Sequence, residues 1–476
     1  MFRTVGDQPS LRESRLPAEL LRLPGELARV DALLDDPAFF APFAAYFHPV
    51  IGRPSTPVEC FLRLMFLKYR YRLGFESLCA EVSDSISWRR FCRIPLDGTV
   101  PHPTTLMKLT TRCGAEAVAG LNEALLARAA GQKLLRTARL RADTTVIPAN
   151  VAYPTGSGLL ARAVRRIAVT GRRIQAAGGA PRTRVRDRSR AAGRRAHAIA
   201  VRLSSRVREG RQAAVSRATG ELAGLAEAAA GEARRLLASA RRSLRRAAAK
   251  AAALTAAGLK DPAAGRRRGR LRRAVSDLAQ LLEATVLIAA QARQRLAGQM
   301  PGGATRRVSL HEPDARPIAK GRLGKPAGFG YKAQVTDNDD GVILDYALEQ
   351  GNPADGPQLA PAIGRVIRRT RAKPRTVTAD RSYGEKATDD DLLALGVRHV
   401  VIPRKGKPGK ARQAAERRPA FRRAVRWRTG CEGRISTLKR QYGWDRTRLD
   451  GTEGARTWAG YGILAHNLVK ISALAS

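Results

Sequence analysis

The sequence predicts an α/β protein with a mixed sheet, an all-helical domain before the sheet and a long basic helical insert within it. Three observations predict this architecture. Apolar residues recur at helical spacing over residues 56–130, polar and apolar residues alternate over 139–147 and again after 330, and residues 158–299 are rich in Ala and Arg but nearly free of aromatic residues. We therefore expect three domains, formed by residues 1–130, by 131–157 together with 301–476, and by 158–300.

The first domain consists of short helices joined by polar turns. Its first predicted helix carries Val58, Leu62, Met65 and Phe66 at helical spacing, and further helices cover residues 75–82 and 85–92. Pro103 opens another helix. Residues 88–91, with Trp88 at their start, form a candidate contact surface. The domain is either a helix-turn-helix that binds DNA or a helical bundle without that role.

The strands of the sheet lie on both sides of the insert. Residues 139–147 alternate, with Leu140 and Ala142 on one face and Arg141 and Asp143 on the other. Two further strands, residues 330–335 and 342–347, flank an Asp-Gly step that suits a tight hairpin turn. Helix and strand then alternate as helix 358–371, strand 376–379, helix 389–395 and strand 399–402. This order describes a mixed α/β sheet.

The insert holds most of the excess charge. Residues 161–300 contain 33 basic and 8 acidic residues, so 33 − 8 gives +25 of the net +46. Helical runs over residues 207–259 and 271–296, the second with an apolar stripe, predict a long antiparallel hairpin with a basic outer surface. Such a hairpin either lies along phosphates or serves as a solvated spacer.

Composition restricts the partners and the compartment. A net charge of +46 with a pI of about 11.5 points to a polyanion, most commonly nucleic acid. The five cysteines show neither paired spacing nor zinc spacing, so we expect buried thiols in a reducing cytosol. Residues 1–16 lack an apolar core of signal-peptide length, and no stretch approaches about 18 uninterrupted apolar residues. We expect a cytoplasmic, nucleoid-associated protein without a membrane partner.

Three carboxylates are the candidate catalytic group. Asp143 lies within the first strand, and Asp380 follows the strand at residues 376–379, so neighbouring central strands bring the two together. The third, Glu432, lies in a helix predicted from Pro419 to Gly443. One side of that helix carries Arg428, Glu432, Ile435 and Lys439. Gly430 and Gly433 weaken the helix beside Glu432, which suits a close approach by another backbone or by DNA.

These residues carry a resemblance to a known group. The spacing Arg428-x₃-Glu432-x₆-Lys439 resembles the Tyr-x₂-Arg-x₃-Glu-x₆-Lys signature of bacterial insertion-sequence transposases with an RNase H-like core and an Asp-Asp-Glu triad, although Val425 stands at the tyrosine position. Trp427 is a nearby aromatic residue that can serve as a surface instead. Other segments are similar to the same group: residues 53–55 (RPS), 67–71 (LKYRY), 88–91 (WRRF), 141–146 (RADTTV), 309–316 (SLHEPDAR), 330–332 (GYK), 351–353 (GNP) and 379–384 (ADRSYG).

The resemblance implies a DNA transposase whose Asp143, Asp380 and Glu432 hold two Mg²⁺ ions, with Mn²⁺ as a substitute, for cleavage and strand transfer. It implies that double-stranded DNA is the partner and that the protein acts as a homodimer on paired element ends. Candidate DNA contacts are Arg428, Lys439, Arg381, Tyr383, Lys332, Arg404 and Lys405. Two alternatives remain: a metal-dependent nuclease of the same fold without strand transfer, and an architectural nucleic-acid-binding protein.

Overall fold

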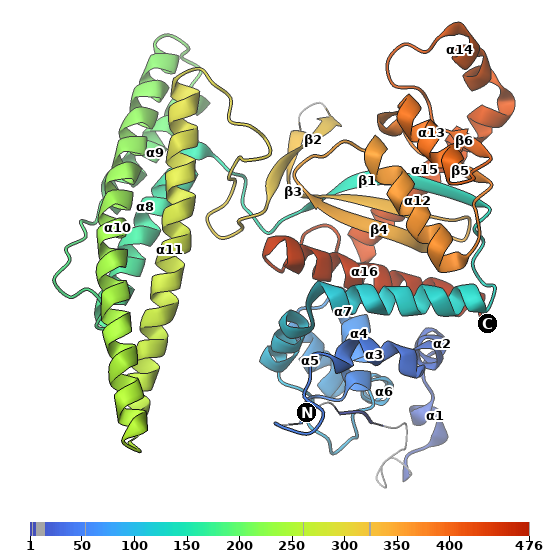
Figure 1. The fold of residues 1–476 in the computed structure, drawn as a ribbon, viewed down its shortest axis with the longest axis horizontal. Coiled ribbons are helices and arrows are strands. Elements are labelled where there is room, and N and C mark those ends of the chain that lie inside the picture. Colours follow the sequence, from blue (N-terminus) through green and yellow to red (C-terminus); the bar gives the residue numbers. More distant parts are fainter. Residues whose placement is uncertain (2, 6–14, 53, 260, 323–324, 476) are drawn as a thin grey trace. The chain divides into compact units, whose positions relative to one another are not determined.

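The structure, a computed structural model, describes residues 1, 3–5, 15–52, 54–259, 261–322 and 325–475. Arg53 of the resembling segments and most of the N-terminal stretch examined for a signal peptide lie outside the described residues. The chain divides into two units (Figure 1). The first, the sheet unit, joins Met1–Asn150 to Ile318–Ser476, and the second, the bundle unit, is Val151–Pro317.

Helices form the N-terminal part of the sheet unit. They are α1 (Ala18–Leu21), α2 (Gly25–Leu34), η2 (Pro37–Phe39), α3 (Ala41–Ala44), α4 (Val58–Arg70), α5 (Phe75–Asp84), α6 (Ile86–Phe91) and α7 (Pro103–Gly131). The core of this part includes α4, which is buried over nearly its whole length. Arg63 on α4 is fully buried and is neutralised by Asp31 and Asp35, each 2.6 Å away.

The surface proposed around Trp88 is mostly occupied by internal contacts. Phe91 is fully buried, and Arg89 donates hydrogen bonds to the backbone carbonyls of Ser83, Pro95 and Gly98. Neither side chain is therefore available to contact DNA in the way the sequence suggested.

A mixed sheet follows, as predicted, and in the described part of the chain it has six strands, of which the first after the insert was not predicted. Its strands are β1 (Arg139–Pro148), β2 (Arg316–Arg322), β3 (Lys325–Asp337), β4 (Ile343–Gln350), β5 (Thr376–Thr378) and β6 (His399–Val401). β1 lies between β3, which runs antiparallel to it, and β5, which runs parallel. β4 pairs with β3, and β6 pairs in parallel with β5. The predicted hairpin turn carries Gly341 at φ 73°, a backbone conformation that favours glycine.

Helices cover both faces of this sheet. They are α12 (Gly356–Thr370), η3 (Arg381–Tyr383), α13 (Lys386–Ala394), α14 (Lys410–Arg417), α15 (Pro419–Gln441) and α16 (Gly451–Leu474). The last of these helices, α16, was not predicted; it is buried along most of its length and packs beside α7 and β4 (Figure 1). A helix that is apolar on all sides lacks the periodic stripe by which surface helices are recognised.

Both faces of β1 are buried, which the alternating pattern did not predict. Arg141 and Asp143 are 6% and 7% exposed although they lie on the polar face. The reason is α15, which packs against that face. A polar strand face can be buried when a helix brings matching polar groups to it, and these groups are described below with the site.

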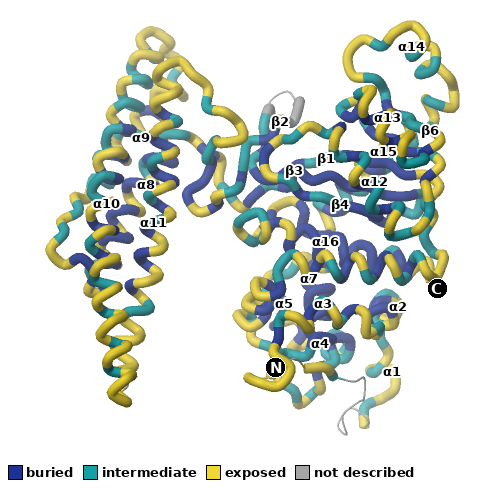
Figure 2. Tube along the Cα trace, in the orientation of Figure 1, coloured by how far each residue is buried: buried dark blue, intermediate teal, exposed yellow. Residues whose placement is uncertain are grey.

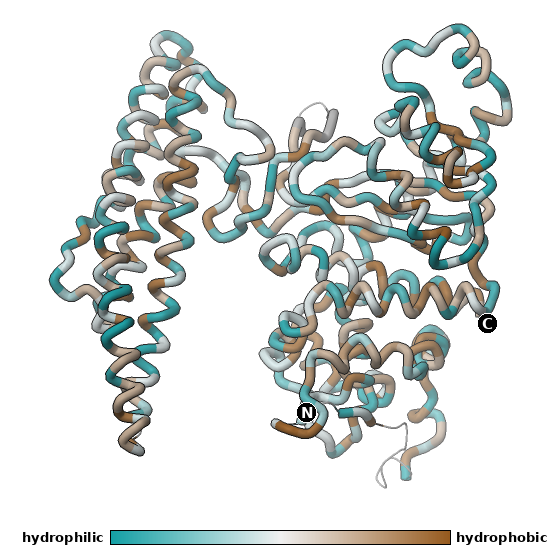
Figure 3. The backbone as a smooth tube through the Cα atoms, viewed as in Figure 1, coloured by the Kyte–Doolittle hydropathy of each residue, from teal (hydrophilic) through white to brown (hydrophobic). Residues whose placement is uncertain are grey.

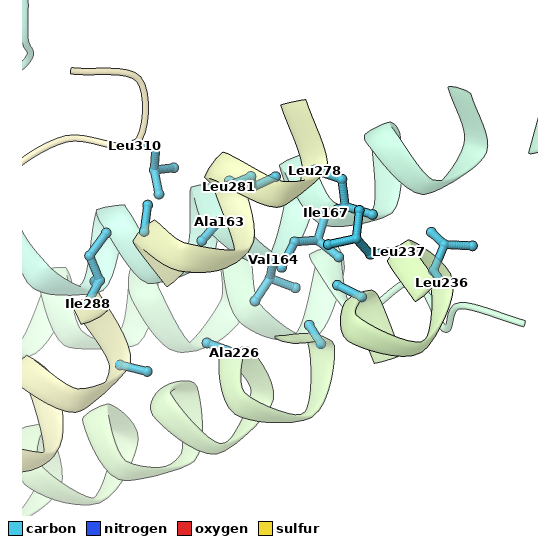
Figure 4. Close-up of a cluster of buried hydrophobic side chains, with 14 of the residues drawn as sticks. Ala163, Val164, Ile167, Ala226, Leu236, Leu237, Leu278, Leu281, Ile288 and Leu310 are labelled. Carbon is cyan, nitrogen blue, oxygen red and sulfur yellow. The ribbon is translucent and has the colours of Figure 1, made fainter. Parts of the chain in front are cut away.

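The bundle unit contains α8 (Gly156–Ala176), α9 (Ser189–Ser204), α10 (Arg211–Ala256) and α11 (Pro262–Leu296). The predicted hairpin corresponds to α10 and α11, and α8 and α9 pack against it. The apolar side chains of all four helices share one core, in which Val164, Ile167, Leu236 and Leu278 meet (Figure 4). α11 is long and apolar enough to be a candidate membrane span by composition, but its apolar stripe is core packing in this unit.

Candidate active site

The sheet brings Asp143 and Asp380 to the same level. Arg141 on β1 pairs in register with Thr378, the last residue of β5. Asp143 and Asp380 each follow this pair by two residues, and both line one pocket. Asp380 caps η3, because its carboxylate accepts a hydrogen bond of 2.8 Å from the backbone N–H of Ser382.

The polar stripe of α15 faces β1. Arg428 donates a 3.1 Å hydrogen bond to the Asp143 carboxylate, and Lys439 donates one to the hydroxyl of Thr145. Asp143 and Thr145 lie on the same face of β1, since side chains two residues apart along a strand point the same way. Arg428 also donates a 2.7 Å hydrogen bond to Glu432, one helical turn further along. One guanidinium therefore joins two of the three candidate carboxylates.

Gly430 permits this close packing of helix on strand. Arg141 reaches across from β1, pairs with Asp337 at 2.7 Å and donates a 2.9 Å hydrogen bond to the backbone carbonyl of Trp427. A Cβ atom at Gly430 would overlap the Arg141 guanidinium, whereas a Cβ atom at Gly433 would meet no heavy atom within 4 Å. The close approach expected from these glycines thus concerns Gly430, and the group that approaches is an arginine side chain.

The aromatic ring of Trp427 is already occupied. The guanidinium groups of Arg139 and Arg141 lie 4.8 and 4.6 Å from its centroid, distances typical of cation–π contacts. Val425, at the tyrosine position of the signature, lines a separate pocket with Pro403 and Phe421.

Burial and like charge make Asp143 hold its proton tightly. Burial raises the pKa of Asp143 to about 7, and the nearby carboxylates of Asp380 and Glu432 act in the same direction. Arg428 and the backbone N–H of Thr144 oppose the rise without cancelling it. The raised pKa of Asp143 indicates that the positive groups around it do not balance the negative charge of the carboxylates. A bound cation would supply the missing positive charge.

The donor set suits a hard divalent cation. Asp143 and Asp380 offer hard oxygen donors to one pocket, and the neighbouring thiol of Cys431 is fully buried with a raised pKa, so it is not a competing ligand. All five cysteines are buried and free, as the sequence predicted. Within the described part of the chain, no three carboxylate, imidazole or thiol groups are arranged as a metal site. The side chain of Glu432 is 59% exposed and pairs with Arg428 instead.

A pocket of about 550 Å³ opens beside the two aspartates. Its lining includes Asp143, Thr145, Asp380, Ser382, Lys332, Asn352, Asp355 and Lys439. Asp355, which was not among the candidates from the sequence, forms an ion pair of 2.7 Å with Lys332. Two features of the sequence could have revealed Asp355. It lies two residues beyond the 351–353 segment, and it is the N-cap of α12.

The remaining DNA-contact candidates differ in their accessibility. Tyr383 is fully buried, and its hydroxyl has no hydrogen-bond partner. Its assignment as a DNA contact is therefore wrong for this structure, because this last residue of η3 has no exposed surface. Arg381 is exposed next to Asp380. Arg404 pairs with Asp389 at 2.9 Å, and Lys405 pairs with Glu385 at 3.0 Å.

Comparison with known families identifies the class of protein. Residues 306–468 match the family described as Transposase DDE domain, and residues 15–112 match the one described as Transposase domain (DUF772). The chain is therefore an insertion-sequence transposase with a DDE core. Asp380 and Glu432 lie inside the first match, while β1 with Asp143 lies between the two, so the case for Asp143 depends on geometry.

One curated relative is 27% identical to this chain over 152 residues. It is an uncharacterized protein, ORF8 in the nfe locus of Rhizobium meliloti, and the similarity covers 29% of this chain and 69% of that protein. No solved structure matches the chain.

Proposed function

We propose that this transposase cleaves phosphodiester bonds at the ends of an insertion sequence and joins the resulting 3′-hydroxyl ends to a target DNA, with Asp143, Asp380 and Glu432 as the catalytic carboxylates. One observation carries the proposal. Arg428 links Asp143 on β1 to Glu432 on α15, and the pKa of Asp143 responds to both other carboxylates. These two observations support a shared site for three acids that lie far apart in the sequence.

The proposed cofactor is a pair of Mg²⁺ ions, with Mn²⁺ as a substitute, because hard oxygen ligands favour these ions. Bound there, the ions would activate a water or a 3′-hydroxyl and stabilise the leaving oxygen at phosphorus. Asp143 and Asp380 already share a pocket, so they are the first ligands in this proposal. Glu432 joins them when Arg428 releases it.

Arg428 and Lys439 are proposed to bind DNA phosphates on either side of the reacting bond. Arg428 offers a planar fork that fits two phosphate oxygens, and Lys439 offers a point charge. A DNA phosphate that takes Arg428 away from Glu432 would free this carboxylate for the site. Substrate binding and assembly of the site would then be coupled through one arginine.

We propose further that the protein acts in the cytoplasm on chromosomal DNA as a homodimer, because an insertion must bring two element ends to one target. Two-fold symmetry suits paired inverted repeats. Protein mixed with DNA fragments that each carry one element end should therefore form a complex of two chains and two fragments. Light scattering measures the mass of this complex. A complex whose mass is that of one chain and one fragment, with no interference when active protein is mixed with Asp380→Asn protein, would contradict the dimer.

The test of the catalytic proposal uses three single variants: Asp143→Asn, Asp380→Asn and Glu432→Gln. Each should lower cleavage of a duplex carrying the DNA that flanks the gene by at least about 1000-fold, since stabilisation of the reacting charges is lost. Each should leave the affinity for the same duplex in EDTA within about twofold of the unmodified protein. Glu453→Gln serves as the matched control, because its side chain is 69% exposed and pairs only with Arg456. Equal losses of cleavage and binding would indicate misfolding and would reject the assignment.

A second assay separates the transposase from a nuclease of the same fold. A duplex with a pre-cut 3′-hydroxyl end is incubated with a supercoiled target and Mg²⁺. Joined products that disappear with Asp380→Asn support strand transfer. Cleavage of uncut ends without any joined product would favour the nuclease.

A further inference from the structure

The bundle unit separates its charges along its length. Where four helices pack together, five arginines are paired with acids on neighbouring segments. The ion pairs are Arg172–Asp187, Arg173–Asp277, Arg188–Glu232, Arg195–Glu221 and Arg293–Glu227. Five acidic residues of this unit therefore form ion pairs within the unit. This part of the bundle is consequently closer to neutral than its arginine content suggests.

The far end of the α10–α11 hairpin has the opposite character. Residues 241–270, which we call the tip, contain ten Lys and Arg residues against a single acid, Asp261. Asp261 caps α11 by accepting a 2.9 Å hydrogen bond from the backbone N–H of Ala264. Of the tip's basic side chains that the structure describes, all but the half-buried Arg268 are exposed, and none takes part in an ion pair.

The tip also lacks a core of its own. The last buried residue of α10 is Ala240 and the first of α11 is Leu271, and none of the described residues between them is buried. In Figure 2 the tip is drawn largely as exposed, in contrast to the rest of the unit. A groove of about 550 Å³ runs between the two helices, lined by Ala247, Leu254 and Arg267 among others. Ala and Arg are strong helix formers, so the tip remains helical with little burial.

The hydropathy and the charge of the tip indicate which kind of partner it can bind. The tip combines short apolar stretches of alanine and leucine with hydrophilic clusters such as residues 266–268 (Figure 3). If a second copy of the tip packed against the first, nine positive charges among the described residues of one tip would face nine on the other. Each tip has a single acid, Asp261, to compensate them. A polyanion removes this repulsion and gains from counterion release. Charge complementarity therefore favours nucleic acid over a second copy.

We propose that the tip binds the sugar-phosphate backbone of duplex DNA without reading its bases, at a place separate from the carboxylate site. The proposal rests on the proposed function in one respect, namely that duplex DNA is the substrate. The α10 part of the tip spans 16 residues, or about 24 Å, which matches roughly seven base pairs of duplex. The tip thus provides a DNA contact on a different unit from the catalytic pocket.

The test compares two triple variants with the same loss of charge. The tip variant is Arg245→Gln/Arg246→Gln/Arg266→Gln, which removes exposed side chains without ion pairs. The control variant is Arg172→Gln/Arg195→Gln/Arg293→Gln, which removes exposed side chains that are paired with acids. Both are made in the full chain with Asp380→Asn, so that DNA stays intact. Unchanged circular dichroism establishes that each variant folds.

Binding to duplexes of about 30 base pairs and of unrelated sequences is measured by fluorescence anisotropy in EDTA at several salt concentrations. If three phosphate contacts are lost, the slope of log K against log salt falls by about 2.7, since each contact contributes about 0.9 on duplex DNA. The control variant should change the slope by less than about 0.5, and all duplex sequences should behave alike. Equal changes in both variants, or no change in the tip variant, would overturn the proposal. A tip variant that alters the mass of the free protein in light scattering would assign the tip to a second copy instead. Because metal and cleavage are absent, the result is independent of whether the carboxylates catalyse strand transfer.

Discussion

Arg141 in the sheet unit and Arg266 in the bundle unit place the same side chain in opposite surroundings. Arg141 is 6% exposed and pairs with Asp337, which is fully buried. Arg266 is exposed and belongs to a segment of the hairpin with ten basic residues and one acid. The first arginine holds a helix to a strand, and the second has no internal partner among the described residues.

This difference shows why net charge alone is a poor guide to the position of a site. Around the candidate site in the sheet unit, Arg141 and Arg428 are each matched with a carboxylate. In the bundle unit the unpaired positive charge is densest in the segment where the helices have no core. Burial makes a charge costly unless it is paired, whereas exposure lets charges accumulate for a partner.

The largest effect should come from removing a buried partner. Arg141→Ala leaves the Asp337 carboxylate buried, with only Arg434 at 3.5 Å to compensate, so the sheet unit should lose about 3–5 kcal/mol of stability. Arg293→Ala breaks an ion pair whose side chains are 48% and 44% exposed, and should cost less than about 1 kcal/mol. Urea unfolding followed by tryptophan fluorescence measures the first, because Trp88, Trp427, Trp444 and Trp458 all lie in the sheet unit. Circular dichroism follows the second. Similar losses for the two variants would mean that the contrast between the units does not hold.

The two glycines of α15 provide a sharper test within one helix. Gly430→Ala introduces a methyl group where the Arg141 guanidinium lies, so the sheet unit should lose about 1–3 kcal/mol through overpacking. Gly433→Ala meets open space and should gain up to about 1 kcal/mol from helix propensity alone. Both substitutions are compared by the fluorescence-detected urea midpoint. Stabilisation by both would show that Arg141 moves aside freely. A Gly433→Ala protein that is stable but binds DNA weakly would indicate that the open space receives DNA.

Much of the sheet and of the helix with the polar stripe was predictable from local pattern. The strand at residues 139–147 and the stripe from Arg428 to Lys439 both carry a period that a single sequence reveals. The predicted strands and helices between residues 330 and 402 lie close to the observed β3, β4, α12, β5, α13 and β6. The hairpin turn at Gly341 was visible because its residue type is imposed by local backbone geometry.

Features that depend on distant segments were not predictable. The burial of the polar face of β1 is caused by α15, which follows some 280 residues later, and no local period records it. Tyr383 was misassigned for the same reason, since the burial of its side chain is decided by tertiary packing. Asp355 was missed because a single acid before a helix is usually a cap and becomes informative only beside Lys332.

Metal binding in the sheet unit should depend on pH between 6 and 8, whereas DNA binding by the tip of the bundle unit should not. The pKa of Asp143 is raised from 3.8 to about 7 in the folded protein, so the protonated form is favoured by folding. This contribution to stability is fully present below pH 3.8 and is lost as the pH rises through about 7. A divalent ion must displace the same proton, so its affinity should fall about tenfold for each pH unit below 7 and level off above it. The measurement is the Mg²⁺-induced shift of the fluorescence-detected melting temperature at pH 6 and pH 8. A pH dependence that survives in Asp143→Asn would assign the titration to another group, and DNA binding by the tip should not change over this range.

The smallest effect should follow from removing the cap of α11. Asp261→Ala deletes the acceptor for the backbone N–H of Ala264, a loss typically worth about 1 kcal/mol of helix stability. Because no described residue of the tip is buried, this loss should stay local and fray the first turn of α11 without weakening the packed part of the bundle. Hydrogen exchange should therefore accelerate severalfold at the amides of residues 264–266, while the exchange of Leu278 and Leu281 stays as it is. Added duplex DNA should slow the exchange at the first turn again, since phosphates that hold the nearby arginines favour the ordered helix. A loss of protection that spreads to Leu278 would show that the tip and the bundle unfold as one unit, and the division between a paired core and an unpaired tip would have to be abandoned.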